Sequence, residues 1–420
     1  MQVDSGRTPS APNDLCSFFL YLQSTWRDWA CVAAMLFFLY LTNVRMDFDG
    51  GNKQVQFSDA RFYTAMAAVA PRLPDRPESV LSQHAQRIVI HYCVGTLSHW
   101  TGLGLEQSYR IVSMALVLGI AAGLISLLLM NNLVLWKRAI LYGIFFLNPY
   151  TVRPFILAPA MLADLVCVSG VLCLLWGIQK INVGWVLAGL AIGELGRHNM
   201  APLSIAIFLW GLLGLSPRLN KTQRTVVIPG SIGIMLLVHL FILELTRGFA
   251  GASSDPPSIL LSLVVRTATG QNDFKTLMEH FVRVGLPLSF MGTTILFSKH
   301  PLKFWLGKDT WTYWLLLLAF VVPVILLDPL LNQKSQTRYV ALGVLIGVAL
   351  VGRMWSKADL SRPPPAKPNL MTYSLGIPLM VGSLHHLHAL NLWEGRPEVF
   401  TIIHVSMALI FGLICRRVVE

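Results

Sequence analysis

Carboxylates are scarce in this chain, and three of them lie close together near its start. Asp47, Asp49 and Asp59 fall in a long polar interval between apolar segments, and residues 48–68 read FDGGNKQVQFSDARFYTAMAA. A carboxylate can act as a general base towards a hydroxyl group, and neighbouring carboxylates can bind a divalent cation. The segment after Asp59 is typical of a short amphipathic helix, so the sequence predicts that Asp59 caps this helix and has a fixed position.

The same three residues also have a purely structural interpretation. Asp59 can cap the helix without any chemical role, because capping is an ordinary use of aspartate. Asp47 and Asp49 can belong to a solvated turn before Gly50 and Gly51. Both interpretations stay open from position alone.

Further ionisable residues lie inside or beside apolar segments. Asp164 follows an apolar run, Glu194 and Arg197 lie between two such runs, and Arg338 opens a late one. Charge at membrane depth is costly and tends to mark functional sites, so these residues are candidates for a substrate site. The alternatives are a local Glu194–Arg197 pair and an Arg338 side chain that reaches the lipid headgroups instead of binding a phosphate.

The elements that must position these residues are membrane helices. The chain has 420 residues, of which 54% are hydrophobic and 13% charged, and its mean hydropathy is +0.59. The apolar runs predict an all-α polytopic bundle of about 12 spans, within a range of roughly 10 to 13. The expected spans are residues 28–44, 111–130, 139–150, 156–176, 183–196, 201–215, 226–245, 284–297, 311–331, 339–351, 370–384 and 399–415.

The connections divide this single membrane domain. Residues 1–25 are expected to be a cytoplasmic tail, residues 45–110 a first outer loop with interfacial helices, and residues 247–282 a second long outer loop. The second interfacial helix is expected over residues 82–100, and the helix from residue 156 should carry Asp164 two turns inside it. Long structured loops are more often functional than short connectors.

The net charge of +12 follows the connections between the spans. With both termini placed in the cytoplasm, basic residues occur in every inner connection and are sparse in the short outer ones, as the positive-inside rule requires. The excess charge therefore indicates membrane orientation and attraction to anionic lipids, and nucleic acid is not an expected partner.

Other motifs exclude some function classes. No Walker lysine motif and no G-x-S-x-G elbow occurs, so the sequence gives no support to ATP-driven transport or serine hydrolysis. His385, His386 and His388 resemble a metal cluster, but adjacent helical residues point in different directions and matched Cys or His partners are lacking.

A family resemblance is carried by short motifs in a fixed order. Asp59-Ala-Arg-Phe-Tyr63 in a long first outer loop resembles the acidic motif of multispanning glycosyltransferases of the C superfamily (GT-C), which use polyprenyl-phosphate sugars. Gln86-Arg87-Ile88 resembles their second interfacial helix, Ala163-Asp164-Leu165 their acidic fourth-helix position, and Arg338-Tyr339 their basic-aromatic pair. Members often show a basic residue followed directly by Glu after a Gly-rich helix, whereas here Glu194 precedes Arg197.

The resemblance implies a transferase and assigns its residues. Asp59 would be the general base, and the substrate-binding residues would be Asp49, Tyr63, Arg87, Asp164, Glu194, Arg197, Arg338 and Tyr339. The donor would be a polyprenyl-phosphate sugar and the acceptor a lipid-linked or envelope glycan. No cofactor is assigned; a divalent cation, Mg or Mn, is a secondary expectation, with Asp47 and Asp49 as its candidate ligands.

Two other function classes fit the same charges. A transporter or lipid flippase would use intramembrane charges to gate a pathway, although paired broken helices and internal symmetry are not visible in the sequence. An assembly subunit of an envelope complex would tolerate neutralisation of the outer carboxylates. A bacterial inner membrane, with the active site facing outward, is the expected location.

Overall fold

The computed structural model describes residues 14–42, 58–74, 82–147, 151–152, 155–156, 158–197, 200–215, 219–248, 291, 306–327, 333–361 and 406. Within these ranges the secondary structure is helical and contains no strand. Among the described helices, three are long and apolar enough to cross a membrane: α5 (Leu105–Leu129), α8 (Ala163–Lys180) and α11 (Lys221–Thr246). The chain is therefore a helical membrane protein.

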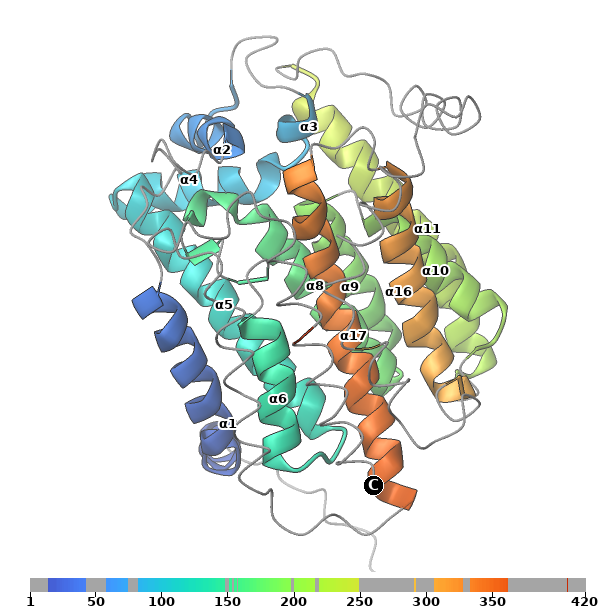
Figure 1. Ribbon diagram of the computed structural model, residues 1–420. Coiled ribbons are helices and arrows are strands. Elements are labelled where there is room, and N and C mark those ends of the chain that lie inside the picture. Colours follow the sequence, from blue (N-terminus) through green and yellow to red (C-terminus); the bar gives the residue numbers. More distant parts are fainter. Residues whose placement is uncertain are drawn as a thin grey trace, which may run out of the picture.

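The long helices run side by side, and a group of shorter helices covers one end of them (Figure 1). This covering group consists of α2 (Ser58–Ala68), α3 (Ser82–Ala85) and α4 (Ile88–Thr101). We call the covered end the α2 end of the bundle. The other helices of the bundle are α1 (Asp14–Thr42), α6 (Leu135–Phe146), α9 (Val183–Gly196), α10 (Ala201–Leu212), α16 (Lys308–Leu327) and α17 (Gln333–Ser361).

Burial separates the central helices from the peripheral ones. In α8, 72% of the most apolar window is buried inside the protein, against 17% in α11. Leu237 and Leu240 of α11 are among its exposed apolar side chains. A helix that is apolar all round needs either protein or lipid on every face, so α8 forms the centre of the bundle and α11 its lipid-facing edge.

Most of the expected spans coincide with helices. The predicted span 183–196 has the same bounds as α9, and helices lie over every other expected span except 284–297, 370–384 and 399–415. Of those three, 370–384 lies outside the described residues, and only residue 291 of the first and residue 406 of the last are described. Of the expected loops, the first contains the helices α2, α3 and α4, whereas nearly all of the second, 247–282, is outside the described part of the chain.

The start of the first helix differs from the prediction. The span was expected to begin at Asp28, but α1 begins at Asp14 and includes part of the expected tail. Asp28 lies halfway along α1, where it is buried. An ion pair with a partner residue of another helix offsets the free-energy cost of burying this carboxylate.

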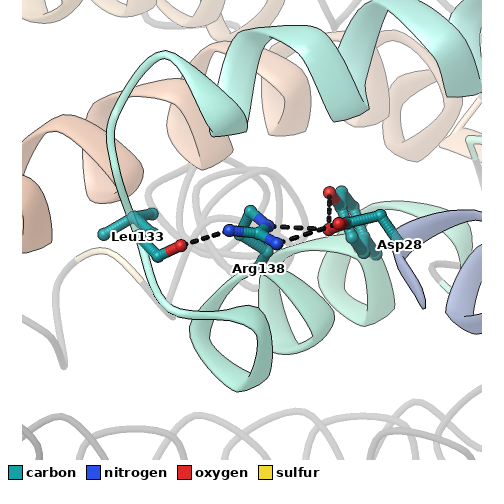
Figure 2. Close-up of polar contacts among 4 residues, drawn as sticks. Asp28, Leu133 and Arg138 are labelled. Carbon is teal, nitrogen blue, oxygen red and sulfur yellow. Dashed lines mark hydrogen bonds and ion pairs between the residues drawn. The ribbon is translucent and has the colours of Figure 1, made fainter. Parts of the chain in front are cut away.

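That partner is Arg138 in the first turn of α6 (Figure 2). Its Nε and Nη2 atoms donate to the two carboxylate oxygens of Asp28 at 2.7 and 2.8 Å, and the Tyr142 hydroxyl donates to the same carboxylate at 2.7 Å. Arg138 also donates to the carbonyl oxygen of Leu133. These forked, charge-assisted bonds tie α1 to α6 far from the α2 end.

Three further boundaries were predicted incorrectly. The helix expected from residue 156 begins at Ala163, after the 3₁₀ turn η1 (Pro159–Met161), so Asp164 lies in the first turn of α8 and not two turns inside a helix. The stretch 82–100 is interrupted at Arg87 between α3 and α4. α2 begins at Ser58, which places Asp59 inside its first turn and not at the capping position.

Proline accounts for the shift at Asp164. Pro159 has no backbone N–H and cannot continue a helix that started upstream, so the regular α-helix begins after it. The consequence is functional, because the first turn of a helix is its most favourable position for a carboxylate.

Candidate functional site

Five of the residues singled out from the sequence come together at the α2 end. Tyr63, Arg87, Asp164, Glu194 and Arg197 are all buried. Arg197, Asp164, Glu194 and Arg87 all lie within electrostatic range of the Cys167 side chain in α8. With His91 and Tyr109, which the sequence analysis did not select, these residues form what we call the polar cluster.

The α8–α9 hairpin positions the charged half of this cluster. The two helices are antiparallel and joined by a short turn, so the start of α8 and the end of α9 meet at the α2 end. Glycines let the backbones touch: a Cβ at Gly170 would lie 2.6 Å from the Gly189 carbonyl oxygen, and a Cβ at Gly196 would lie 2.6 Å from that of Ala163. Small residues permit this close approach in membrane helices.

Close packing brings Asp164 and Arg197 into contact. Arg197 caps the C-terminus of α9, and its Nε atom forms an ion pair with Asp164. Their side chains are 1% and 2% exposed, so the pair is removed from solvent. The carboxylate lies at a helix N-terminus and the guanidinium at a helix C-terminus, where the helix dipoles stabilise both charges.

Glu194 lies one turn before Arg197 and is also buried. The sequence left open a simple i,i+3 pair between Glu194 and Arg197, but the ion pair of Arg197 extends across the hairpin to Asp164. Oε1 of Glu194 has no hydrogen-bond partner among the described residues. A buried polar atom in this state is unusual and merits a functional explanation.

The aromatic half of the cluster links α2 to α4 and α5. The Tyr63 and His91 rings stack with centroids 4.2 Å apart and an interplanar angle of 6°. Nδ1 of His91 lies 3.0 Å from the Tyr109 hydroxyl, which donates to the Tyr63 carbonyl oxygen at 3.2 Å. Nη1 of Arg87 donates to the Tyr63 hydroxyl. Tyr63 is therefore held through its ring, its hydroxyl and its backbone.

The protonation state of His91 follows from its surroundings. Burial, together with the positive charge of Arg87, lowers the pKa of His91 to about 3, although the charge of Asp164 acts in the opposite direction. The imidazole is therefore neutral at physiological pH. A neutral imidazole has one N–H donor and one nitrogen that accepts.

Asp59 belongs to the helix that covers this cluster. α2 packs against α4, and it also contacts η1, the turn that leads directly into Asp164. Asp59 lies in the first turn of α2 and Tyr63 one turn later. The contacts of the Asp59 side chain lie outside the described part of the structure. Its position near the polar cluster therefore follows from the packing of α2 alone.

The remaining candidates are described in part or not at all. Arg338 and Tyr339 lie in the second turn of α17, and α17 begins at the α2 end (Figure 1). Their side chains are not among those described. Asp47 and Asp49, and the histidines 385, 386 and 388, lie wholly outside the described ranges. Among the residues that are described, no group of three or more His, Cys, Asp or Glu side chains could hold a metal ion.

No family model, curated protein or solved structure matches this chain. The geometry of the polar cluster is thus the basis for assigning a function.

His91 and Tyr109 were missed for different reasons. His91 lies among apolar residues of α4, where a single histidine has no distinctive pattern. Tyr109 lies just before the expected span 111–130, at a position where an interfacial aromatic belt would form. In the structure Tyr109 is fully buried. The spacing of Arg87 and His91, one helical turn apart, is the sequence signal that could have connected them.

Proposed function

We propose that this protein is a membrane glycosyltransferase that moves a sugar from a polyprenyl-phosphate donor to an acceptor hydroxyl at the non-cytoplasmic face. The observation that carries the proposal is the buried Asp164–Arg197 pair, with Arg87 in the same electrostatic environment, beneath the helix that bears Asp59. Buried charges of both signs at the end of an apolar bundle suit a ligand with an anionic phosphate and a polar sugar. The motif resemblance to the GT-C superfamily agrees with this assignment.

The proposed step is a single displacement. Asp59 takes the proton of the acceptor hydroxyl as its oxygen attacks the anomeric carbon. The bond from that carbon to the phosphate oxygen breaks, and the phosphate leaves with the electron pair. The leaving group needs no proton, so one carboxylate base suffices where glycoside hydrolysis generally uses two carboxyl groups. The anomeric configuration is inverted.

Cationic side chains complete the proposed site. Arg338 stabilises the charge that develops on the leaving phosphate. Arg197, which was also a candidate for this role, is already paired with Asp164, so we assign it to holding Asp164 in place, where Asp164 orients substrate hydroxyls. Asp49, Tyr63, Arg87, Glu194 and Tyr339 remain proposed substrate-binding residues, and a Mg or Mn ion at Asp47 and Asp49 remains a secondary prediction.

The proposed setting is a bacterial inner membrane with about 12 spans. Both termini lie in the cytoplasm and the α2 end faces outward, so the acceptor is a lipid-linked or envelope glycan. The donor's lipid tail lies among the helices, and its sugar lies at the polar cluster.

The decisive experiment is Asp59→Asn in proteoliposomes supplied with polyprenyl-phosphate sugars. We expect sugar transfer to fall about 10²- to 10⁴-fold, because the amide cannot accept the proton. Glu106→Gln is the matched control, since Glu106 is a half-exposed carboxylate at the same end of the bundle. Equal amounts of each variant in the membrane are verified by quantitative immunoblotting.

Two outcomes would contradict the assignment. Sugar transfer by Asp59→Asn at the wild-type rate would show that Asp59 is not the general base. Translocation of a lipid or solute by the wild-type protein, without any new glycosidic bond, would instead favour the transporter or flippase alternative.

A further inference from the structure

The hydrogen bonds of the polar cluster fix which nitrogen of His91 carries its proton. The Tyr109 hydroxyl has a single proton, and the Tyr63 carbonyl oxygen can only accept, so that proton belongs to the 3.2 Å bond between them. The 3.0 Å contact between Nδ1 of His91 and the Tyr109 oxygen must then use a proton on Nδ1. Because the imidazole is neutral, Nε2 is unprotonated and is a hydrogen-bond acceptor.

Nε2 is buried without a hydrogen-bond donor among the described residues. The His91 side chain is fully buried, and its ring is fixed by the stacked Tyr63 ring and by Tyr109. Burial of an acceptor without a donor is energetically unfavourable. Nε2 lies on the other side of the ring from Tyr109, and Arg87 and Asp164 are the charged groups that act on this ring.

We propose that Nε2 of His91 accepts a hydrogen bond from a hydroxyl group of the donor sugar, and that this contact contributes to sugar selectivity. The inference rests on the proposed function. In that function the reacting acceptor hydroxyl is bound by Asp59, so the hydroxyls left to be recognised inside the bundle belong to the donor. A site built to bind a hydroxyl discriminates strongly against an analogue that lacks it, because its polar group would be left unpaired.

Tyr109 is a positioning residue in this arrangement. By accepting a hydrogen bond from the Nδ1–H group, the Tyr109 hydroxyl fixes the tautomer in which Nε2 carries no proton. The same logic applies to metal-bound histidines, where the partner of one nitrogen determines the state of the other.

Two substitutions at His91 distinguish a role of Nε2 in binding the sugar from a role of the side chain in holding the cluster together. In His91→Asn, the amide nitrogen can replace Nδ1 as the donor to Tyr109, but no acceptor remains at the Nε2 position. In His91→Gln, the longer side chain can place an acceptor oxygen near Nε2. We expect His91→Asn to lower kcat/KM for the natural donor about 10- to 100-fold, and His91→Gln to recover most of it. A sugar donor that lacks the recognised hydroxyl should be a poor substrate for the wild type. His91→Asn should use this analogue and the natural donor equally well.

A second measurement does not require turnover. The ¹⁵N spectrum of protein labelled in its histidine rings, assigned by the signals lost in His91→Asn, should show Nδ1 protonated and Nε2 unprotonated. Addition of a polyprenyl-phosphate hexose should move the Nε2 signal, and sugar-free polyprenyl phosphate should not. Protonation at Nε2 in place of Nδ1 would overturn the inference.

The results also separate this inference from the proposed function. If the wild type transfers sugar, Asp59→Asn does not, and a folded His91→Asn does so at the wild-type rate, the inference is wrong and the function stands. If no sugar is transferred but the hexose donor moves the Nε2 signal, the binding site stands and the transferase assignment fails. If neither occurs, both are wrong.

Discussion

At the scale of single residues, the polar cluster depends on mutual neutralisation. Asp164 and Arg197 are both removed from solvent, and either charge alone in that position would be very costly. The pair therefore adds little to stability, since two well-packed apolar residues of similar volume can fill the same space. Its value lies in placing a carboxylate at the end of an apolar bundle.

Removal of one partner should destabilise the protein more than removal of both. We expect Asp164→Asn or Arg197→Gln to lower the free energy of unfolding by about 3–5 kcal/mol, because the remaining charge is buried without its counter-ion. The double variant should cost less than either single variant, because no buried charge is then left without its counter-ion. Thermal unfolding in detergent, followed by loss of soluble protein, measures the effect.

The chain offers a matched control for this cycle. Glu106 and Arg110 form an ion pair in α5 with about half of each side chain exposed, so Glu106→Gln should cost less than about 1 kcal/mol. Strict additivity of Asp164→Asn and Arg197→Gln would show that the two side chains do not interact in the membrane-embedded protein.

At the scale of elements, the α8–α9 hairpin determines where the charged residues lie. A Cβ at Gly170, Gly177, Gly189 or Gly196 would meet the backbone of the other helix. Asp164 and Arg197 lie at the open end of this hairpin, so a change in helix separation should alter their contact directly.

Gly170→Ala tests this dependence. A Cβ there would lie 2.6 Å from the Gly189 carbonyl oxygen and 2.6 Å from the Gly193 Cα, so the helices must move apart. We expect a loss of about 1–3 kcal/mol in stability together with a loss of transfer activity. In contrast, Gly119→Ala in α5 meets nothing within 4 Å and should be neutral or stabilising by up to about 1 kcal/mol. Equal behaviour of the two variants would refute a packing role for Gly170.

At the scale of the whole molecule, two polar layers lie at different levels of the bundle. The polar cluster joins α2 and α4 to α5, α8 and α9 at the α2 end. The Asp28–Arg138 pair (Figure 2) instead joins α1 to the first turn of α6, two helices that lie towards the other end of the bundle in Figure 1. Only the distribution of basic residues relates these levels to the two sides of the membrane.

Orientation can be measured with single cysteines in a variant that lacks the six native ones. Gly104, before α5, is exposed at the α2 end, and Lys180, at the end of α8, is exposed at the opposite end. We expect a membrane-impermeant maleimide to label Gly104→Cys in intact cells and Lys180→Cys only after permeabilisation. The reverse pattern would place the polar cluster in the cytoplasm and exclude the proposed envelope acceptor.

The sequence by itself determined that the chain is helical and membrane-embedded, and it located most helices that the structure describes, because hydropathy and helix signals are local properties of the chain. It also singled out Tyr63, Arg87, Asp164, Glu194 and Arg197, since charged or motif residues are conspicuous in an apolar chain. Only the tertiary structure decided that Arg197 contacts Asp164, that Asp28 has a partner in α6, and that His91 and Tyr109 belong to the same cluster. Partners depend on how closely distant helices approach each other, and that distance is the result of packing.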